Sequence, residues 1–192
     1  MQEFKIWFEI GFDHIINYQA LDHILFIVAL TVIYDIKMIK KIVILITAFT
    51  VGHTLTLILS TLNLIQYDQK IIEFAIPLTI AVTAINNIRK RNQALSEGVN
   101  PSYYLALFFG LIHGLGFSNY LKALLIGDNI LLELFSFNIG VEIGQIVIVV
   151  LFLCIGFIFS KFFFSKKNEW ILFVSSLILG ISLLLITDAK FW

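Results

Sequence analysis

Residues 42–60 read IVILITAFTVGHTLTLILS, an apolar run that contains one histidine and no lysine, arginine or carboxylate. A helix needs about 20 apolar residues to cross the hydrocarbon core of a bilayer. Because this run has that length and carries no lysine, arginine or carboxylate, it predicts a transmembrane helix.

The composition extends this prediction to the whole chain. Of the 192 residues, 59% are hydrophobic and 14% are charged, whereas a soluble domain has about 25% charged residues. The length allows about six spans with short connections, which together form a single transmembrane domain over residues 1–192. The formal net charge is zero, so there is no electrostatic case for binding nucleic acid.

We therefore expect an all-α, polytopic membrane helix bundle of about six transmembrane helices with an N-terminal interfacial helix. In residues 4–16, phenylalanines and charged side chains each recur every four residues, which gives adjacent apolar and charged stripes on one helix. The first span is short for a full crossing, so it begins below the membrane surface or borders a thinned region. The expected spans cover about residues 20–34, 42–60, 71–87, 103–121, 130–159 and 170–187.

Basic residues predict the orientation of the bundle. They gather on alternate connections, and the positive-inside rule places those connections in the cytoplasm. We expect the protein in the bacterial inner (cell) membrane, with both termini on the outer side. The basic residues concerned are Lys37, Lys40, Lys41, Arg89, Lys90, Arg91, Lys161, Lys166 and Lys167.

Histidine and carboxylate side chains, which are types that can bind metals, lie in or beside the apolar runs. Their depth follows from a rise of ~1.5 Å per residue, which puts His53 about 16 Å and His113 about 15 Å from the cytoplasmic ends of their helices. Glu142 is about 18 Å from the outer end of its helix by the same count. Asp22 and His23 lie near the outer end of the first span. We expect these groups to converge between the middle and the outer half of the membrane.

These residue types favour a metal site. An ionised carboxylate in hydrocarbon costs at least ~2.5 kcal/mol and persists only with a partner, a water-filled cavity or a bound cation. Neutral imidazole binds transition metals, and a carboxylate adds a ligand or orients a ligating histidine. We predict a site for nickel, cobalt or zinc formed by His14, Asp22, His23, His53, His113 and Glu142, with Thr50, Asn138 and Gln145 beside it.

Other interpretations remain open at individual positions. A single intramembrane histidine often only packs and hydrogen-bonds a neighbouring carbonyl. His14 belongs to the interfacial segment, so it either joins the site or faces water. The lipid bilayer and a metal ion are the expected partners, and the sequence is also compatible with a homo-oligomer.

Four segments carry a resemblance to a known family. In order along the chain they are Asp22–Phe26 (DHILF), Phe49–Leu57 (FTVGHTLTL), His113–Phe117 (HGLGF) and Phe137–Gln145 (FNIGVEIGQ). With these segments the chain resembles the HupE/UreJ family, membrane proteins that are associated with hydrogenase and urease accessory functions and regarded as nickel or cobalt permeases.

The resemblance implies a metal permease of about six spans, with His14, Asp22, His23, His53, His113 and Glu142 on the metal path. This chain departs from the family pattern in three ways. Seven residues separate His14 from Asp22, where the family usually has five. Asn86-Asn87 stands where the family often has Glu-Asn, which removes a charge. The N-terminus also lacks the features of a cleavable signal peptide, which family members often have.

Three functions compete on these residues. The first is transport of nickel or cobalt. The second is an intramembrane zinc hydrolase for a lipid or membrane-anchored substrate, with Glu142 or Asp22 as the general base. The third is a non-catalytic scaffold in which the polar cluster only specifies helix packing. A path that continues from the site to the cytoplasm would favour transport, and a closed pocket would favour hydrolysis.

Overall fold

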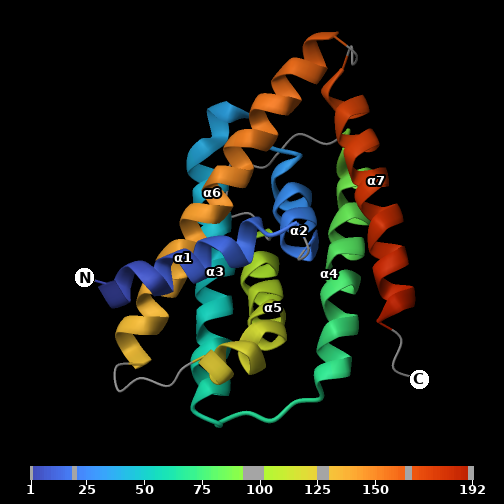
Figure 1. Cartoon of the computed structure of the whole chain (residues 1–192). Helices are drawn as coiled ribbons and strands as arrows, with labels where there is room; N and C mark the ends of the chain where they lie inside the picture. The colour runs from blue at the N-terminus through green and yellow to red at the C-terminus, as the bar shows by residue number, and fades with distance from the viewer. Residues whose placement is uncertain (1, 19–20, 93–101, 125–129, 163–165, 190–192) are drawn as a thin grey trace.

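The computed structural model describes residues 2–18, 21–92, 102–124, 130–162 and 166–189, except for the side chains of Ser160 and Lys161. Within these ranges the chain is helical and contains no strand, so the predicted all-α membrane bundle is confirmed (Figure 1). The helices are α1 (Gln2–Ile16), α2 (Leu21–Thr31), the short 3-10 helix η1 (Ile36–Met38), α3 (Ile39–Thr61), α4 (Gln69–Lys90), α5 (Ser102–Leu124), α6 (Ile130–Phe162) and α7 (Lys167–Asp188).

Five helices, α3 to α7, are long and apolar enough to cross a membrane. They coincide with the second to sixth expected spans. The first expected span corresponds to α2, whose 11 residues reach about 16 Å at the usual helical rise. The bundle therefore has five full-length helices and one half-length helix. Ala20, where we expected the first span to begin, lies outside the described residues.

Glycines bring α3 and α5 into backbone contact. A Cβ atom added at Gly52 would collide with the carbonyl oxygen of Leu107, and one added at Gly110 would collide with that of Phe49. A Cβ at Gly114 would collide with the carbonyl oxygen of His53. Such close packing of small residues is typical of membrane helices. It holds the histidines of α3 and α5 on neighbouring backbones.

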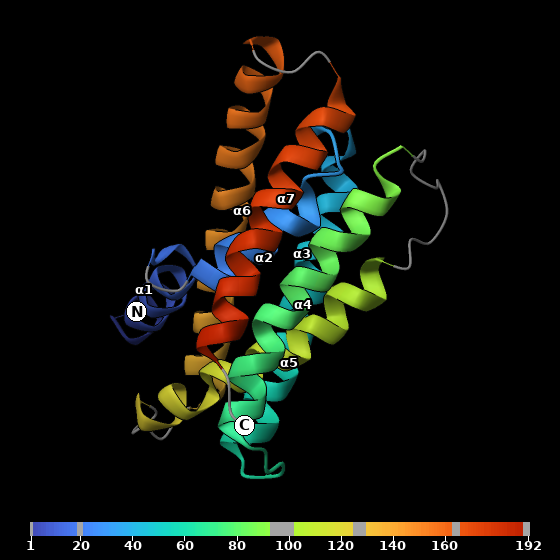
Figure 2. The same ribbon diagram turned by 90° about the vertical axis from the view of Figure 1, so that its right-hand side faces the viewer.

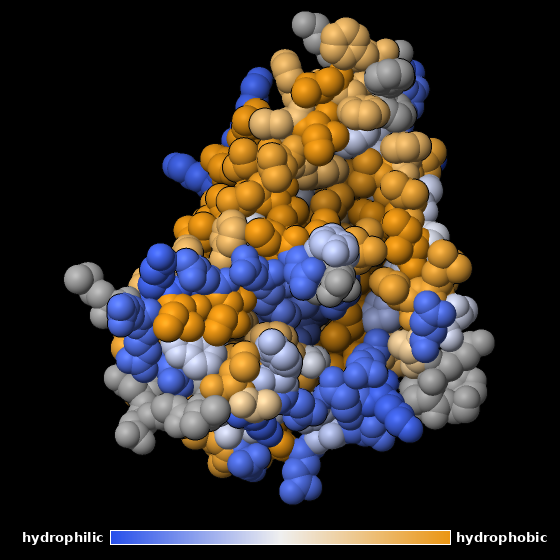
Figure 3. All heavy atoms as spheres, viewed as in Figure 1, coloured by the Kyte–Doolittle hydropathy of each residue, from blue (hydrophilic) through white to orange (hydrophobic). Residues whose placement is uncertain are grey.

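The N-terminal helix α1 crosses α6 at a steep angle instead of running along the bundle (Figure 1). Gly11 of α1 meets the backbone of Phe137, and Gly140 of α6 meets that of Phe8. Lys5 and Glu9 lie on the exposed face, 3.7 Å apart. Figure 3 shows a hydrophilic band at the level of α1 below a broad hydrophobic surface. This arrangement agrees with the predicted interfacial helix.

The basic connections meet at one end of the bundle. Lys167 donates a hydrogen bond to Asp35 at 2.7 Å, and Asn168 donates one to Asn92 at 2.9 Å. These contacts join the connections before α3, after α4 and before α7. Figure 2 shows α4 and α7 side by side along the bundle. Residues 93–101 and Lys190 lie outside the described part of the chain.

Candidate metal centre

Four helices bring the histidines together. His14 lies in the last turn of α1 and His23 in the first turn of α2, while His53 and His113 come from α3 and α5. One ligand nitrogen from each of His14, His23 and His53 lies within 4.8 Å of the others. The ring of His113 is centred 5.7 Å from that of His23. The expected convergence of the histidines is therefore present, and His14 belongs to the group instead of facing water.

Hydrogen bonds set the tautomers of two of these rings. Nδ1 of His113 lies 2.9 Å from the carbonyl oxygen of Phe109, and Nδ1 of His23 lies 3.2 Å from Oδ1 of Asp22. Because a carbonyl or an ionised carboxylate oxygen can only accept, each Nδ1 carries the proton. The Nε2 atoms of both rings are then left as bases with a free lone pair.

The site contains several buried nitrogens without a hydrogen-bond partner among the described residues. They are Nε2 of His14, His23 and His113 and both ring nitrogens of His53. A buried polar atom left unpaired costs about 1–3 kcal/mol. A cation that accepts lone pairs would satisfy several of these atoms at once. An all-nitrogen donor set suits nickel, cobalt or zinc and does not suit calcium or magnesium, which prefer oxygen.

Aromatic rings enclose the cluster. Phe117 is centred 3.7 Å from the ring of His14, and Phe26 and Phe49 are 4.9 and 5.2 Å from that of His113. Phe137 stacks with His53 at 6.5 Å. These rings exclude water from one side of the site, which strengthens electrostatic interactions there. Their role was not predictable from the sequence, although Phe49 and Phe109 each precede a site histidine by four residues.

The carboxylate and amides of α6 connect to threonines on α3. Thr47 donates to Glu142 at 2.7 Å. Thr50 donates to Gln145 at 2.9 Å, and Thr54 donates to Asn138 at 2.6 Å. These bonds hold α3, and with it His53, against α6. Glu142 is not part of the compact histidine group, so its role as a metal ligand stays a prediction.

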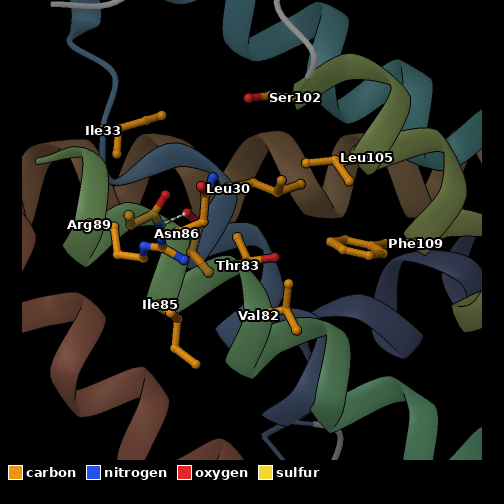
Figure 4. A pocket seen from close by; sticks show the side chains of 12 residues that line it. Leu30, Ile33, Val82, Thr83, Ile85, Asn86, Arg89, Ser102, Leu105 and Phe109 are labelled. Atoms are coloured by element: carbon orange, nitrogen blue, oxygen red, sulfur yellow. Dashed lines mark hydrogen bonds between the residues drawn. The ribbon is translucent and has the colours of Figure 1, made fainter. Parts of the chain in front are cut away.

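A cavity of about 280 Å³ lies between α2, α4 and α5. Thr83, Asn86, Asn87 and Arg89 of α4 line one wall of this α4 cavity, and side chains of α2 and α5 line the others (Figure 4). The amide of Asn87 donates to the carbonyl oxygen of Ala29 at 2.6 Å, which ties α4 to α2.

The α4 cavity and the histidine cluster share one residue. Phe109 lines the cavity, and its carbonyl oxygen accepts the hydrogen bond from His113. The ring of Phe109 also packs against Phe26 at 5.7 Å. Phenylalanine rings therefore separate the nitrogen-rich site from a cavity that has mixed polar and apolar walls and lies nearer the basic end of the bundle.

Comparisons with known proteins identify the family. Neither a curated protein nor a solved structure matched this sequence. A family model described as "HupE / UreJ protein" matches residues 1–188, which is nearly the whole chain. The chain belongs to the HupE/UreJ family.

Proposed function

We propose that this protein transports a divalent transition metal, nickel or cobalt, through the membrane. The observation that carries the proposal is the set of buried, unpaired imidazole nitrogens on His14, His23, His53 and His113. Membership of the HupE/UreJ family, which is linked to nickel and cobalt transport, supports the same cargo.

The α4 cavity supports transport over storage of the metal. It lies beyond Phe26 and Phe109 from the histidine cluster and continues toward the basic end. Asn86 and Asn87 offer oxygen atoms there, and the guanidinium of Arg89 disfavours retention of a cation. Weak binding beside a positive charge favours release. The positive-inside rule makes this end cytoplasmic in the bacterial inner membrane, so we infer movement from the outer side inward.

The imidazoles and the carboxylate of the site have different roles in binding the ion. The neutral imidazoles donate lone pairs to the cargo ion and replace part of its hydration shell. The Asp22 carboxylate, held by His23, supplies negative charge beside the ion. That charge lowers the cost of placing a divalent cation among phenylalanine rings. Binding of the ion by the imidazoles and by the Asp22 carboxylate does not require any covalent bond to be made or broken.

A zinc hydrolase is the second candidate, and one observation favours it. Three clustered histidines with a carboxylate paired to one of them match the ligand sets of catalytic zinc sites. However, both candidate bases are already engaged, Asp22 by His23 and Glu142 by Thr47. A packing cluster without metal is supported less, because histidines that only pack would be expected to complete their hydrogen bonds.

The test uses full-length protein purified without a polyhistidine tag and reconstituted into vesicles that contain a metal-sensitive dye. We expect exchangeable nickel or cobalt binding, and uptake that His23→Ala and His53→Ala abolish. Ser182→Ala is the control, because Ser182 is buried on α7 and, among the described residues, its hydroxyl bonds only to carbonyls of its own helix. Tightly held zinc without uptake would favour the hydrolase. Absence of metal binding under every loading condition would contradict both metal functions.

A further inference from the structure

A groove of about 740 Å³ lies between α6, α7 and the segment that follows α2. In Figure 1, α6 and α7 form the legs of an inverted V, with α2 between them. The helix α2 ends at Thr31, and residues after it line the groove. The segment Val32–Ile36 closes only one side of the groove.

The walls of this groove are apolar. Phe152, Phe157 and Ile158 line it from α6, and Trp170 lines it from α7. The Trp170 ring stacks with Phe152 at 5.9 Å and lies against Gly156. In a bilayer such a surface is covered by hydrocarbon, because water does not reach that depth. The size falls in the usual range of ligand sites, about 300–1,000 Å³.

The mouth of the groove carries positive charge at the basic end of the bundle. Lys166 and Lys167 line it together with one carboxylate, Asp35. Lys167 pairs with Asp35 at 2.7 Å, whereas Lys166 makes no ion pair among the described residues. One positive charge therefore stays uncompensated where the groove meets the headgroup level. Basic pockets between membrane helices bind anionic lipid headgroups.

We propose that this groove binds one anionic phospholipid, with an acyl chain between α6 and α7 and the phosphate on Lys166. The lysine supplies the attraction to charge, and the aromatic walls supply the surface for the chain. Trp170 lies where these two parts meet and reports on the occupant. The proposal does not depend on metal transport.

The test measures quenching of Trp170 fluorescence by lipids with brominated acyl chains in reconstituted full-length protein. A Trp170→Phe variant identifies the part of the signal that comes from Trp170. One lysine near a lipid surface contributes about a fivefold preference for an anionic lipid. We expect brominated phosphatidylglycerol to bind at least about fivefold more strongly than brominated phosphatidylcholine.

Lys166→Gln should remove most of this preference. Lys70→Gln is the matched control, because Lys70 is also exposed but lies at the opposite end of the bundle, and it should leave the preference unchanged. Equal quenching by the two lipids in the wild-type protein would overturn the proposal. Disulfide formation between Cys154 residues of two copies, together with loss of quenching, would also overturn it, because Cys154 lines the groove and a second copy would then be the occupant.

Discussion

The carboxylate of Asp22 lies 3.2 Å from Nδ1 of His23, its neighbour in the chain. This contact keeps the proton on Nδ1 and leaves Nε2 free to bind a metal. Loss of such an orienting carboxylate typically weakens metal binding about 10–100-fold. We expect Asp22→Asn to reduce nickel or cobalt affinity by this factor, measured by competition with a metallochromic chelator.

Asp13→Asn is the control for this prediction. Asp13 precedes His14 and is exposed on α1, so its substitution removes the same charge close to the site without removing a partner of His23. We expect little change in affinity. If both variants weakened binding equally, general electrostatics would explain the effect, and the orienting role of Asp22 would be wrong.

The α3–α5 contact should be intolerant of a single methyl group. A Cβ at Gly110 would collide with the carbonyl oxygen of Phe49, so Gly110→Ala must move the two backbones apart. Overpacking of this kind costs about 1–3 kcal/mol. We expect lower thermal stability in detergent and weaker metal binding, because His53 and His113 lie on the displaced helices.

Gly180→Ala provides the comparison for Gly110→Ala. Nothing lies within 4 Å of a Cβ atom added at Gly180 on α7, so both stability and metal affinity should be retained. If Gly110→Ala were equally well tolerated, the α3–α5 backbone contact would not be required for the site.

The orientation of the bundle gives a labelling prediction. Gln66 lies in the connection between α3 and α4, whereas Lys37 lies at the basic end, and both are exposed. In a Cys154→Ala background, a membrane-impermeant maleimide should label Gln66→Cys in intact cells but label Lys37→Cys only after lysis. The reverse pattern would contradict the positive-inside assignment and the inward direction of transport.

Most of the fold was predictable from the sequence because lipid exposure demands long apolar helices. The expected spans over 103–121 and 170–187 correspond to α5 and α7 with only short extensions at their ends. Gly110 and Gly114, which flank His113 in the sequence, lie at the α3–α5 contact, and small residues are typical of close contacts between membrane helices. The length of the apolar runs and the small size of glycine are local features of the sequence, and they predict the helices and their close contacts.

The parts that depend on tertiary structure were not predictable. The sequence left open whether His14 joins the site, because its position depends on how α1 crosses α6 through Gly11 and Gly140. The end of α2 at Thr31 has no proline or glycine signal, and the apolar sequence continues through Val32 and Ile33. The phenylalanines that enclose the histidine cluster could not be identified either. The chain has 19 phenylalanines, and the sequence does not distinguish those at the site from those that face lipid.

The ring of Phe109 stands between the histidine cluster and the α4 cavity. It is almost fully buried, and Phe26 packs against it. Because an apolar ring opposes passage of a hydrated ion, Phe109→Ala should open a connection between the two spaces. We expect faster cobalt entry into dye-loaded vesicles, with the initial rate normalised to folded protein measured by size exclusion.

Phe108→Ala is the matched control for this prediction. The two residues are adjacent, but Phe108 is 55% exposed on the outside of the helix, whereas Phe109 is 6% exposed. The Phe109 carbonyl that orients His113 is a backbone group, so the Phe109→Ala variant keeps that bond and should still bind metal. Faster entry with unchanged affinity would therefore locate the barrier at the ring. Unchanged entry in a folded Phe109→Ala variant, with a wild-type protein that does transport, would show that the metal leaves the histidines by another route.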